Sequence, residues 1–415
     1  MSEAKGMVKN MNANEGPLDG LKVIDFSTYQ AGPRAAKLCA DWGADVIAVG
    51  NTSEIPGGDF GKMYGVPTTD SENPLMQNNS ANKRSIRVNM KTAEGMAIME
   101  HLLEKTDIII TNFREDALKR LNMDYETLSA KYPHLIYGSV TGYGDKGPDS
   151  ERPGFDSTAY WARGGLMASI GEPDAPPPVP LGGFGDNPTA VFLVCGILAA
   201  VYGRINTGKG QKVTGALYNT AIFNMNLELA CANYYPNMVK KSVMNPVSPL
   251  INVYKCADEK WISLTSLNYN KDWKLLCETF ERPDLVDDPR CNTARAIGKN
   301  SAEIAQLFSE IIKKEKRDEW VSRWSEADIP HELVLDMKEI LTDEQAHVNS
   351  FLQPCTFESG NTIYMAGTPV QLSDYEPNCF ERLMKQPGEH TKEVMKEIGY
   401  SDNEIINMKT NGIIG

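Results

Sequence analysis

Residues 22–49, KVIDFSTYQAGPRAAKLCADWGADVIAV, decide the fold class of this chain. Lys22 to Phe26 is a short β-rich run, Ser27 to Gly32 is a loop of small residues, and Pro33 to Trp42 is a helix that begins with a proline. Asp45 to Val49 is the next strand. A strand, a helix and a strand within about thirty residues favour a parallel pair joined by a right-handed crossover.

The same alternation continues along the chain. Ile108 to Ile110 and Leu135 to Val140 are apolar strands, and the helical patterns 114–121 and 125–131 lie between them. Lys212 to Ala216 begins another strand. An open α/β sheet binds its ligand outside the carboxyl ends of its strands. We therefore expect the site among the loops that follow the strands, which are residues 27–32, 111–113 and 141–144.

The composition changes after this α/β region. Glycine and proline crowd residues 144–185, and so long an irregular segment is usually functional or disordered. Ala190 to Tyr202 is an apolar helix. From Ala221 a helical stretch leads into a second unit, where Leu250 to Cys256 and Lys260 to Thr265 predict a hairpin. Helical patterns follow over residues 271–280 and 301–327.

Length and charge limit the classes of function. A chain of 415 residues exceeds one hydrophobic core, and its net charge of -13 argues against nucleic acid or an anionic membrane as the main partner. The start of the chain lacks the apolar core of a signal peptide, and no run of about 18 apolar residues follows, so we expect a cytoplasmic protein. The eight cysteines form no Cys-x-x-Cys pair, so we expect no metal site.

Seven segments occur in order along nearly the whole chain, from about Leu18 to Gly399. They are residues 17–26 (PLDGLKVIDF), 30–33 (QAGP), 43–47 (GADVI), 82–86 (NKRSI), 112–113 (NF), 207–211 (TGKGQ) and 388–391 (GEHT). Together they resemble the class III, or family III, coenzyme A transferases, and most of all the 2-hydroxyacyl-CoA transferase branch. The resemblance implies an enzyme that transfers CoA between an acyl-CoA donor and a free carboxylic acid, with a CoA thioester as substrate and no permanently bound cofactor.

The resemblance also implies an architecture. The family fold has a Rossmann-like large domain, built from both ends of the chain, and an inserted smaller α+β domain. Applied to this sequence, residues 17–221 and 329–415 form the large domain and residues 222–328 form the linker and small domain. Two chains of the family assemble as a homodimer of interlocked rings.

By resemblance the catalytic nucleophile is Asp174, in the segment GEPDAPP of residues 171–177. The family aspartate attacks the acyl-CoA thioester and passes through an aspartyl anhydride and an aspartyl-CoA thioester. A carboxylate is ionised at pH 7 and needs no base, but it needs donors for the developing oxyanion. The residues alone favour a turn aspartate at this position. Asp156 and Asp186, which also have glycine neighbours, are the alternatives, with loop capping as their simpler interpretation.

Seven further positions match functional residues of the family. Gln30 corresponds to a glutamine beside the nucleophile, where its amide would orient the carboxylate or donate to an oxyanion. The positions that match the lining of the CoA site are Ala31, Lys83, Asn112, Phe113, Arg120 and Tyr143. Seen alone, Lys83 and Arg120 are typical of surface charges and Asn112 of a turn.

Several departures from the family pattern bear on the substrate. Ala48-Val49-Gly50 and Asn51 replace the usual charged residues, Thr141 stands where formyl-CoA transferases have lysine, and no glycine run precedes Ser248. These changes argue against formyl or oxalyl substrates. Residues 153–165 are similar to 2-hydroxyacyl-CoA transferases, which suggests a 2-hydroxy or enoyl acid as acceptor. There Tyr160 and Trp161 either line an acyl pocket or pack a helix.

Two other functions remain to be weighed. A 2-methylacyl-CoA racemase of the same fold needs a histidine base where this chain has Phe155. A nicotinamide-binding Rossmann module needs Gly-x-Gly-x-x-Gly, but the first turn contains only Gly32. We therefore keep the racemase as the alternative and rank the nicotinamide-binding module below it.

Overall fold

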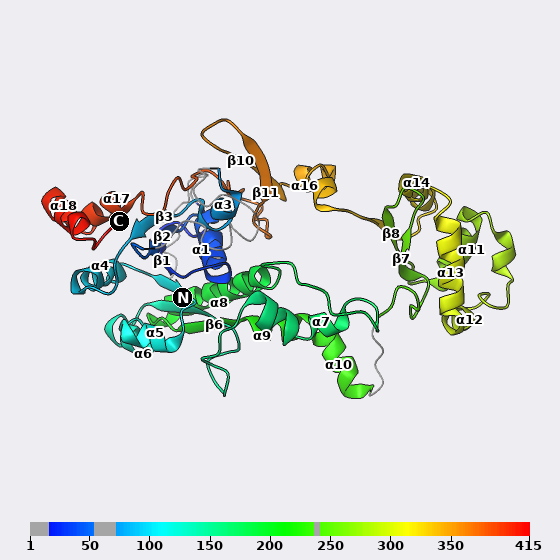
Figure 1. The fold of residues 1–415 in the computed structure, drawn as a ribbon, viewed down its shortest axis with the longest axis horizontal. Helices are drawn as coiled ribbons and strands as arrows, with labels where there is room; N and C mark the ends of the chain where they lie inside the picture. Colours follow the sequence, from blue (N-terminus) through cyan, green and yellow to red (C-terminus); the bar gives the residue numbers. More distant parts are fainter. Residues whose placement is uncertain (1–15, 54–71, 236–240) are drawn as a thin grey trace. The chain divides into compact units, whose positions relative to one another are not determined.

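Figure 1 shows the computed structural model, which describes residues 16–53, 72–235 and 241–415. The chain forms two compact units. The first unit contains Met1–Gly165, Pro180–Leu227 and Gln345–Gly415, and the second contains Leu166–Val179 and Glu228–Glu344. Each unit has its own hydrophobic core.

A six-stranded parallel sheet forms the centre of the first unit. Its order is β3-β2-β1-β4-β5-β6, with each neighbouring pair parallel. The strands are β1 (Lys22–Phe26), β2 (Asp45–Gly50), β3 (Arg84–Arg87), β4 (Ile108–Thr111), β5 (Ile136–Thr141) and β6 (Lys212–Ala216). This is the order of a doubly wound Rossmann sheet, whose direction of winding reverses between β1 and β4. The predicted α/β class with a parallel sheet is confirmed.

Helices cover both faces of this sheet because the strands are apolar on both sides. Val23 belongs to the core under one face and Ile24 to the core under the other, and Ile108 and Ile109 divide in the same way. Successive side chains of a strand point to opposite faces, so a strand that is buried on both sides has a continuous run of apolar residues in its sequence.

The first unit contains ten helices besides α16 (Glu344–Val348), among the residues that the structure describes. They are α1 (Ala31–Asp41), α3 (Pro74–Ser80), α4 (Ala93–Leu103), α5 (Glu115–Arg120), α6 (Tyr125–Lys131), the π-helix η2 (Asp156–Ala162), α8 (Asp186–Thr207), α9 (Leu217–Asn224), α17 (Thr391–Glu397) and α18 (Asp402–Thr410). A hairpin of β10 (Leu352–Thr356) and β11 (Thr362–Ala366) also belongs to this unit.

Helix α8 is longer than the predicted helix over residues 190–202. By length and composition this helix is apolar enough to cross a membrane, although the sequence predicted no such segment. Of its most apolar window, 33% is buried inside the structure. Leu193 and Ile197 of α8 belong to the same core as α1, and the helix also packs on β5 and β6. The apolar sequence of α8 therefore serves packing against the sheet.

The second unit contains an antiparallel sheet and a group of helices. The sheet has the order β7-β8-β9, with β7 (Ile251–Lys255), β8 (Trp261–Thr265) and β9 (His331–Val334). The predicted hairpin over residues 250–265 is the β7–β8 pair. The helices are α7 (Leu166–Ser169), α10 (Asn226–Tyr234), α11 (Tyr269–Thr279), η3 (Pro283–Val286), α12 (Ala294–Lys299), α13 (Ser301–Ile312), α14 (Arg317–Glu326) and α15 (Met337–Ile340). The next helix, α16 (Glu344–Val348), begins at the last residue of this unit and belongs otherwise to the first.

Residues 222–227 stay in the first unit, and two larger differences from the expected division follow. Strand β9 pairs with β8, so the chain stays in the second unit beyond residue 329 and rejoins the first at Gln345. Residues 166–179 also cluster with the second unit, although the expected division placed them in the large domain. Both differences arise from pairings between distant segments, which a local pattern does not contain.

Candidate active site at the carboxyl edge of the sheet

The loops after β1 and β4 are joined by one asparagine. The backbone N–H of Thr28 donates to Asn112 Oδ1 at 2.9 Å, and Asn112 Nδ2 donates to the Thr28 carbonyl at 2.6 Å. These strands are neighbours at the point where the winding of the sheet reverses, which is where open α/β sheets bind ligands. Asn112 therefore holds the shape of the crevice, and its amide is already used on the protein backbone.

Gln30 directly precedes α1, and its side chain is held at both ends. Asn79 Nδ2 donates to Gln30 Oε1 at 2.7 Å, and Gln30 Nε2 donates to Asn187 Oδ1 at 3.3 Å. Gly183 lies beside it, because a Cβ at that glycine would be 3.5 Å from Gln30 Nε2. Ala31, the first residue of α1, is buried. The amide of Gln30 thus has a defined orientation between α3 and the start of α8.

Lys83 is buried, with its ammonium between β1 and α1. Lys83 Nζ lies 2.7 Å from Asp25 Oδ2 and donates to the Pro33 carbonyl at 2.7 Å. Ser27 Oγ donates to the other oxygen of Asp25. The expected contact of Lys83 with a phosphate has no support in this geometry. Its position is that of an internal anchor for the loop that carries Gln30.

Tyr143, in the loop after β5, lies among cations. The guanidinium of Arg163 is 4.9 Å from the centre of its ring, and that of Arg152 is 5.6 Å away. Phe113, after β4, packs on Phe26 with ring centres 4.8 Å apart. A cation over an aromatic face is attracted by its quadrupole. Tyr143 is therefore part of a cluster with two arginines, both of which also pair with Asp149.

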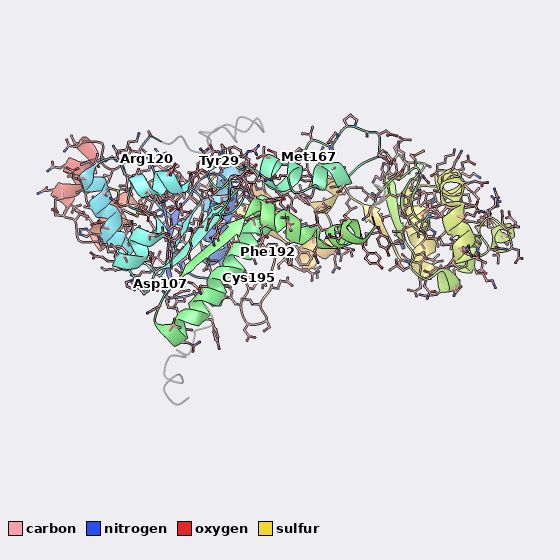
Figure 2. The ribbon with its side chains drawn as sticks, turned by 90° about the horizontal axis from the view of Figure 1, so that it is seen from below. Tyr29, Asp107, Arg120, Met167, Phe192 and Cys195 are labelled. Atoms are coloured by element: carbon pink, nitrogen blue, oxygen red, sulfur yellow. The ribbon has the colours of Figure 1, made fainter. Side chains whose placement is uncertain are left out.

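Arg120 ends α5 and is exposed. Figure 2 shows Arg120 and Tyr29 at one edge of the sheet and Asp107, which precedes β4, at the opposite edge. The structure thus brings Gln30, Ala31, Asn112, Phe113 and Tyr143 to the carboxyl edge, with Arg120 on the same side.

Asp156 and Asp186 form a pair of carboxyl groups at the start of α8. The backbone N–H of Gly185 donates to Asp156 Oδ1 at 2.6 Å. Burial raises the pKa of Asp156, although the backbone amides of residues 183–186 oppose the change. Burial, and then the negative charge of Asp156, raises the pKa of Asp186 to about 7. A carboxyl group that retains its proton is a poor nucleophile at neutral pH.

Asp174 lies in a turn of the second unit. The backbone N–H of Ala175 donates to the Glu172 carbonyl at 3.2 Å, and Asp174 itself is exposed. The carboxylate of Glu172 accepts from the Val243 backbone at 2.6 Å and from Ser242 Oγ, which ties the turn to residues 242–243. Asp174 belongs to the second unit and Gln30 to the first.

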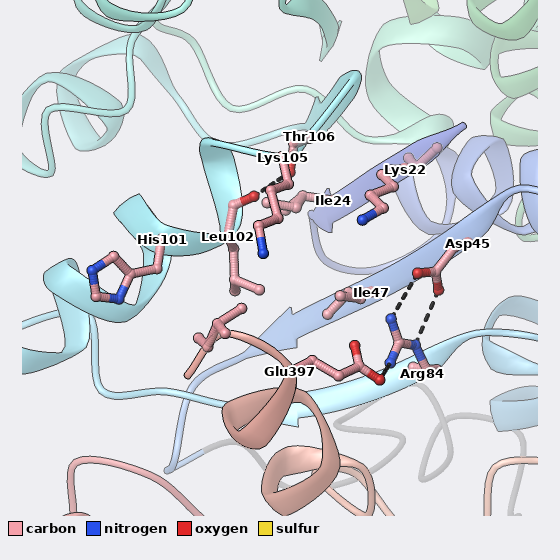
Figure 3. A pocket seen from close by; sticks show the side chains of 12 residues that line it. Lys22, Ile24, Asp45, Ile47, Arg84, His101, Leu102, Lys105, Thr106 and Glu397 are labelled. Carbon is pink, nitrogen blue, oxygen red and sulfur yellow. Dashed lines mark hydrogen bonds and ion pairs between the residues drawn. The ribbon is translucent and has the colours of Figure 1, made fainter. Parts of the chain in front are cut away.

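A pocket at the opposite edge of the sheet does not fit the same role. It is lined by the beginnings of β1, β2 and β3 and by α4 and α17. Figure 3 shows Arg84 bridged to Asp45 and Glu397, with nitrogen to oxygen distances of 2.7 Å in both pairs. The amino ends of parallel strands are the edge where open α/β sheets seldom bind ligands, and these charges already neutralise one another.

Among the described residues, one group of carboxylates is close enough to hold a metal ion. Glu115, Asp124 and Glu126 have oxygens within 4.8 Å of one another. Both oxygens of Asp124 accept from Thr127, one from its backbone N–H at 3.0 Å and one from its hydroxyl at 2.8 Å. This is the N-cap of α6, so the cluster is explained by helix capping.

Comparison with known proteins agrees with this geometry. The sequence profile of CoA-transferase family III matches residues 18–391. The chain belongs to CoA-transferase family III. It is 36% identical over 406 residues, 96% of this chain and 99% of the other, to a protein named (R)-2-hydroxy-4-methylpentanoate CoA-transferase from Clostridioides difficile. It is 33% identical over 406 residues, 95% and 96% of the two chains, to cinnamoyl-CoA:phenyllactate CoA-transferase from Clostridium sporogenes.

A solved structure supports the same assignment. The CAIB/BAIF family protein from Brucella suis superposes with a TM-score of 0.81 at 28% identity, covering 92% of this chain and 100% of that one. The predicted family and the prediction that this chain is a CoA-transferase enzyme are therefore confirmed. A CoA thioester is the substrate that this class of enzyme uses.

Sequence reasoning missed several residues of this family III site. Asn79 and Asn187 hold Gln30, and Tyr29 has a positive φ of 64° directly before it. Two asparagines in a polar run carry no signal of what they contact. A positive φ at tyrosine is also unreadable from sequence, since the left-handed region is typical of glycine or asparagine.

Proposed function

We propose that this transferase moves CoA from an acyl-CoA donor to a free 2-hydroxy or enoyl carboxylic acid, with Asp174 as nucleophile. The observation that carries the acceptor class is the full-length similarity to the two transferases named for 2-hydroxy-4-methylpentanoate and for phenyllactate. The replacement of lysine by Thr141 also separates this chain from formyl-CoA transferases.

The proposed reaction has four balanced steps. A carboxylate oxygen of Asp174 attacks the donor thioester carbon, the C–S bond breaks, and CoA leaves as the thiolate. The thiolate attacks the aspartyl carbonyl of the mixed anhydride and expels the donor acid as a carboxylate. The acceptor carboxylate then attacks the aspartyl-CoA thioester and again releases the thiolate. Attack of that thiolate on the acceptor carbonyl forms the new acyl-CoA and regenerates Asp174.

The surroundings of the three candidate aspartates support the choice of Asp174. Asp174 is exposed on a turn, whereas burial raises the pKa of Asp156 and of Asp186. An ionised carboxylate attacks without a base. The exposed Asp174 therefore suits nucleophilic attack better than either buried carboxyl group.

Gln30 is proposed as the group that orients this chemistry. An amide nitrogen carries two N–H donors, and Asn187 accepts from that of Gln30. The other N–H can donate to the oxyanion that develops on the thioester carbonyl. Because Asn79 fixes the amide oxygen, the direction of that donor is set before the substrate binds.

For the CoA nucleotide we propose the carboxyl edge of the sheet. Arg120 supplies an exposed guanidinium suited to a phosphate, and Tyr143 with its neighbouring arginines supplies an aromatic and cationic surface. Asn112, Ala31 and Phe113 shape the loops that the nucleotide would meet.

We also propose a large domain built from both ends of the chain with an inserted smaller domain, the interlocked-ring homodimer and the cytoplasmic compartment. Large apolar side chains on α8 and α9 are exposed within the first unit, which suits burial by a second copy. They are Phe192, Tyr202, Ile205, Ile222 and Phe223. Scattered apolar residues are ordinary on a surface, whereas a contiguous group marks an interface.

Trapping the covalent intermediate tests the nucleophile. The enzyme is incubated with an acyl-CoA and hydroxylamine, and its peptides are mapped by mass spectrometry. Hydroxylamine converts an aspartyl anhydride or thioester to a hydroxamate, which we expect on Asp174. A hydroxamate on Asp156 or Asp186 would contradict the assignment. Exchange of the Cα proton for deuterium in the absence of an acceptor acid would support the racemase instead.

A further inference from the structure

Two exposed aromatic rings stand beside Gln30. Tyr29 is 69% exposed and Phe155 is 53% exposed, although both are large apolar side chains. Their ring centres lie 6.1 Å apart at an interplanar angle of 90°, which is a favourable edge-to-face geometry. Tyr29 comes from the loop after β1 and Phe155 from the segment before η2. Tertiary folding thus assembles an aromatic pair at the carboxyl edge of the sheet.

The backbone at Tyr29 is strained, and its neighbours hold it in place. Its φ of 64° lies in the left-handed region, where a Cβ is crowded by the carbonyl oxygen. Asn79 Nδ2 donates to the Tyr29 carbonyl at 3.2 Å, and Asn112 holds both backbone groups of Thr28. The same Asn79 also holds Gln30. Strain of this kind persists where the surroundings enforce it and is often found at functional sites.

A second aromatic pair follows Gly183, the glycine beside the Gln30 amide. Gly183 contacts the Gln30 amide, and the next residue, Phe184, is 51% exposed. The ring of Phe184 packs on buried Trp161, with centres 5.2 Å apart. The Gln30 amide is therefore held by Asn79 and Asn187, and exposed aromatic side chains lie near it in the chain and in the fold.

We propose that the Tyr29–Phe155 pair binds the apolar substituent of the acyl group and selects aryl or branched-alkyl acids over short ones. This inference rests on the proposed function and deepens it. The carboxyl carbon must reach the polar groups around Gln30, so a substituent on the neighbouring carbons would lie against the adjacent rings. Neither ring carries a charge, so an apolar substituent that is buried against the rings strengthens substrate binding. A formyl or oxalyl group has no such surface.

The test compares acceptor acids with one common acyl-CoA donor. The panel is 2-hydroxy-3-phenylpropanoate, 2-hydroxy-4-methylpentanoate and 2-hydroxypropanoate, read as kcat/KM by mass spectrometry. The variants are Tyr29→Gly, Tyr29→Phe and Phe155→Ala. Glycine removes the ring and relieves the positive φ, so Tyr29→Gly should fold at least as well as the parent chain. The control is Tyr364→Ala in β11, which removes an exposed ring from an edge-to-face pair with His347 of α16.

We expect Tyr29→Gly and Phe155→Ala to lower kcat/KM for the aryl and branched acids by about 10-fold or more, and for 2-hydroxypropanoate by about 2-fold or less. Tyr29→Phe and Tyr364→Ala should leave the ratio of the three acids unchanged. Equal losses for all three acids, or no loss, would overturn the inference while leaving the proposed function in place. A change from dimer to monomer in these variants would also overturn it, since the rings would then be subunit contacts. Failure of the parent enzyme with every acid would refute the proposed function itself.

Discussion

Asn112 holds Thr28 by both of its backbone groups, with a 2.9 Å bond to the Thr28 N–H and a 2.6 Å bond to its carbonyl. The two residues are 84 positions apart in sequence and join the loops of neighbouring strands. A backbone pair of this kind leaves the loop between β1 and α1 little freedom. The position of Gln30 therefore depends on a residue that does not contact it.

Replacing Asn112 should loosen this loop. Asn112→Ala removes two hydrogen bonds and leaves the part-buried Thr28 N–H without its acceptor, for an expected loss of about 1–2 kcal/mol in the free energy of unfolding. Urea unfolding measures the loss, and kcat/KM should fall as well. Asn112→Asp keeps the acceptor for the Thr28 N–H but sets a charged oxygen against the Thr28 carbonyl, so it should also lose stability. Equal stability of the alanine variant and the parent would contradict the proposed role.

The buried ion pair of Lys83 and Asp25 should contribute more to stability than the hydrogen bonds of Asn112. Both side chains are almost inaccessible, at 1% and 4% exposure. Lys83→Met leaves Asp25 as an uncompensated buried charge and should cost about 3–5 kcal/mol in urea unfolding, whereas the double variant with Asp25→Asn should recover much of this loss. If Lys83 instead bound a phosphate of CoA, Lys83→Met would weaken CoA binding in calorimetry without this loss of stability.

Removing the proposed nucleophile should abolish transfer and spare the fold. Asp174 is exposed in its turn, so Asp174→Asn should unfold at the same urea concentration as the parent. The rate of CoA transfer should fall on the order of 10³-fold or more, because no other group replaces an attacking carboxylate. Asp287→Asn, an exposed aspartate of the same unit, is the control. Retained turnover in Asp174→Asn would refute the mechanism.

The raised pKa of Asp186 predicts a dependence of stability on pH. Its pKa is about 7 in the folded chain, because of burial and then of Asp156, and about 3.9 in an unfolded chain. Between these values the native state keeps a proton that the unfolded state has released. The contribution of Asp186 to stability is therefore lost as pH rises from about 4 to 7.

Asp186→Asn stays neutral and should escape that loss. At pH 8 it should be more stable than the parent by up to about 4 kcal/mol, and the difference should be smaller at pH 5. Urea unfolding at the two pH values measures it, with Asp287→Asn as the exposed control. A difference that does not grow between pH 5 and pH 8 would contradict the raised pKa.

The proposed homodimer can be tested on its apolar surface. Phe223 is exposed in the single chain, and its ring packs against Phe192 with centres 5.3 Å apart. Phe223→Glu would place a charge in an interface core, where it lacks a partner, and should shift the protein to a monomer in light scattering. A parent protein that is itself a monomer would contradict the interlocked-ring proposal.

Local patterns in the sequence were sufficient for the elements of the fold. The apolar runs of residues 22–26 and 108–110, buried on both faces, predicted parallel strands, and the turn of residues 257–259 predicted the β7–β8 hairpin. These features depend on neighbours within a few residues, so the sequence contains them. The ordered family segments likewise indicated the enzyme class, and the roles of Gln30 and Asp174 that the resemblance implies stay predictions.

The tertiary structure alone decided how distant segments meet. It pairs β9 with β8 and so keeps the chain in the second unit until Gln345. It also buries Lys83 against Asp25 and turns the backbone of Tyr29 to a φ of 64°. In the sequence, Lys83 is typical of a surface charge and Tyr29 of an ordinary loop residue. The burial of Lys83 and the positive φ of Tyr29 depend on partners dozens of positions away. No local preference of a short segment specifies such partners, because the contacts exist only once the sheet has formed.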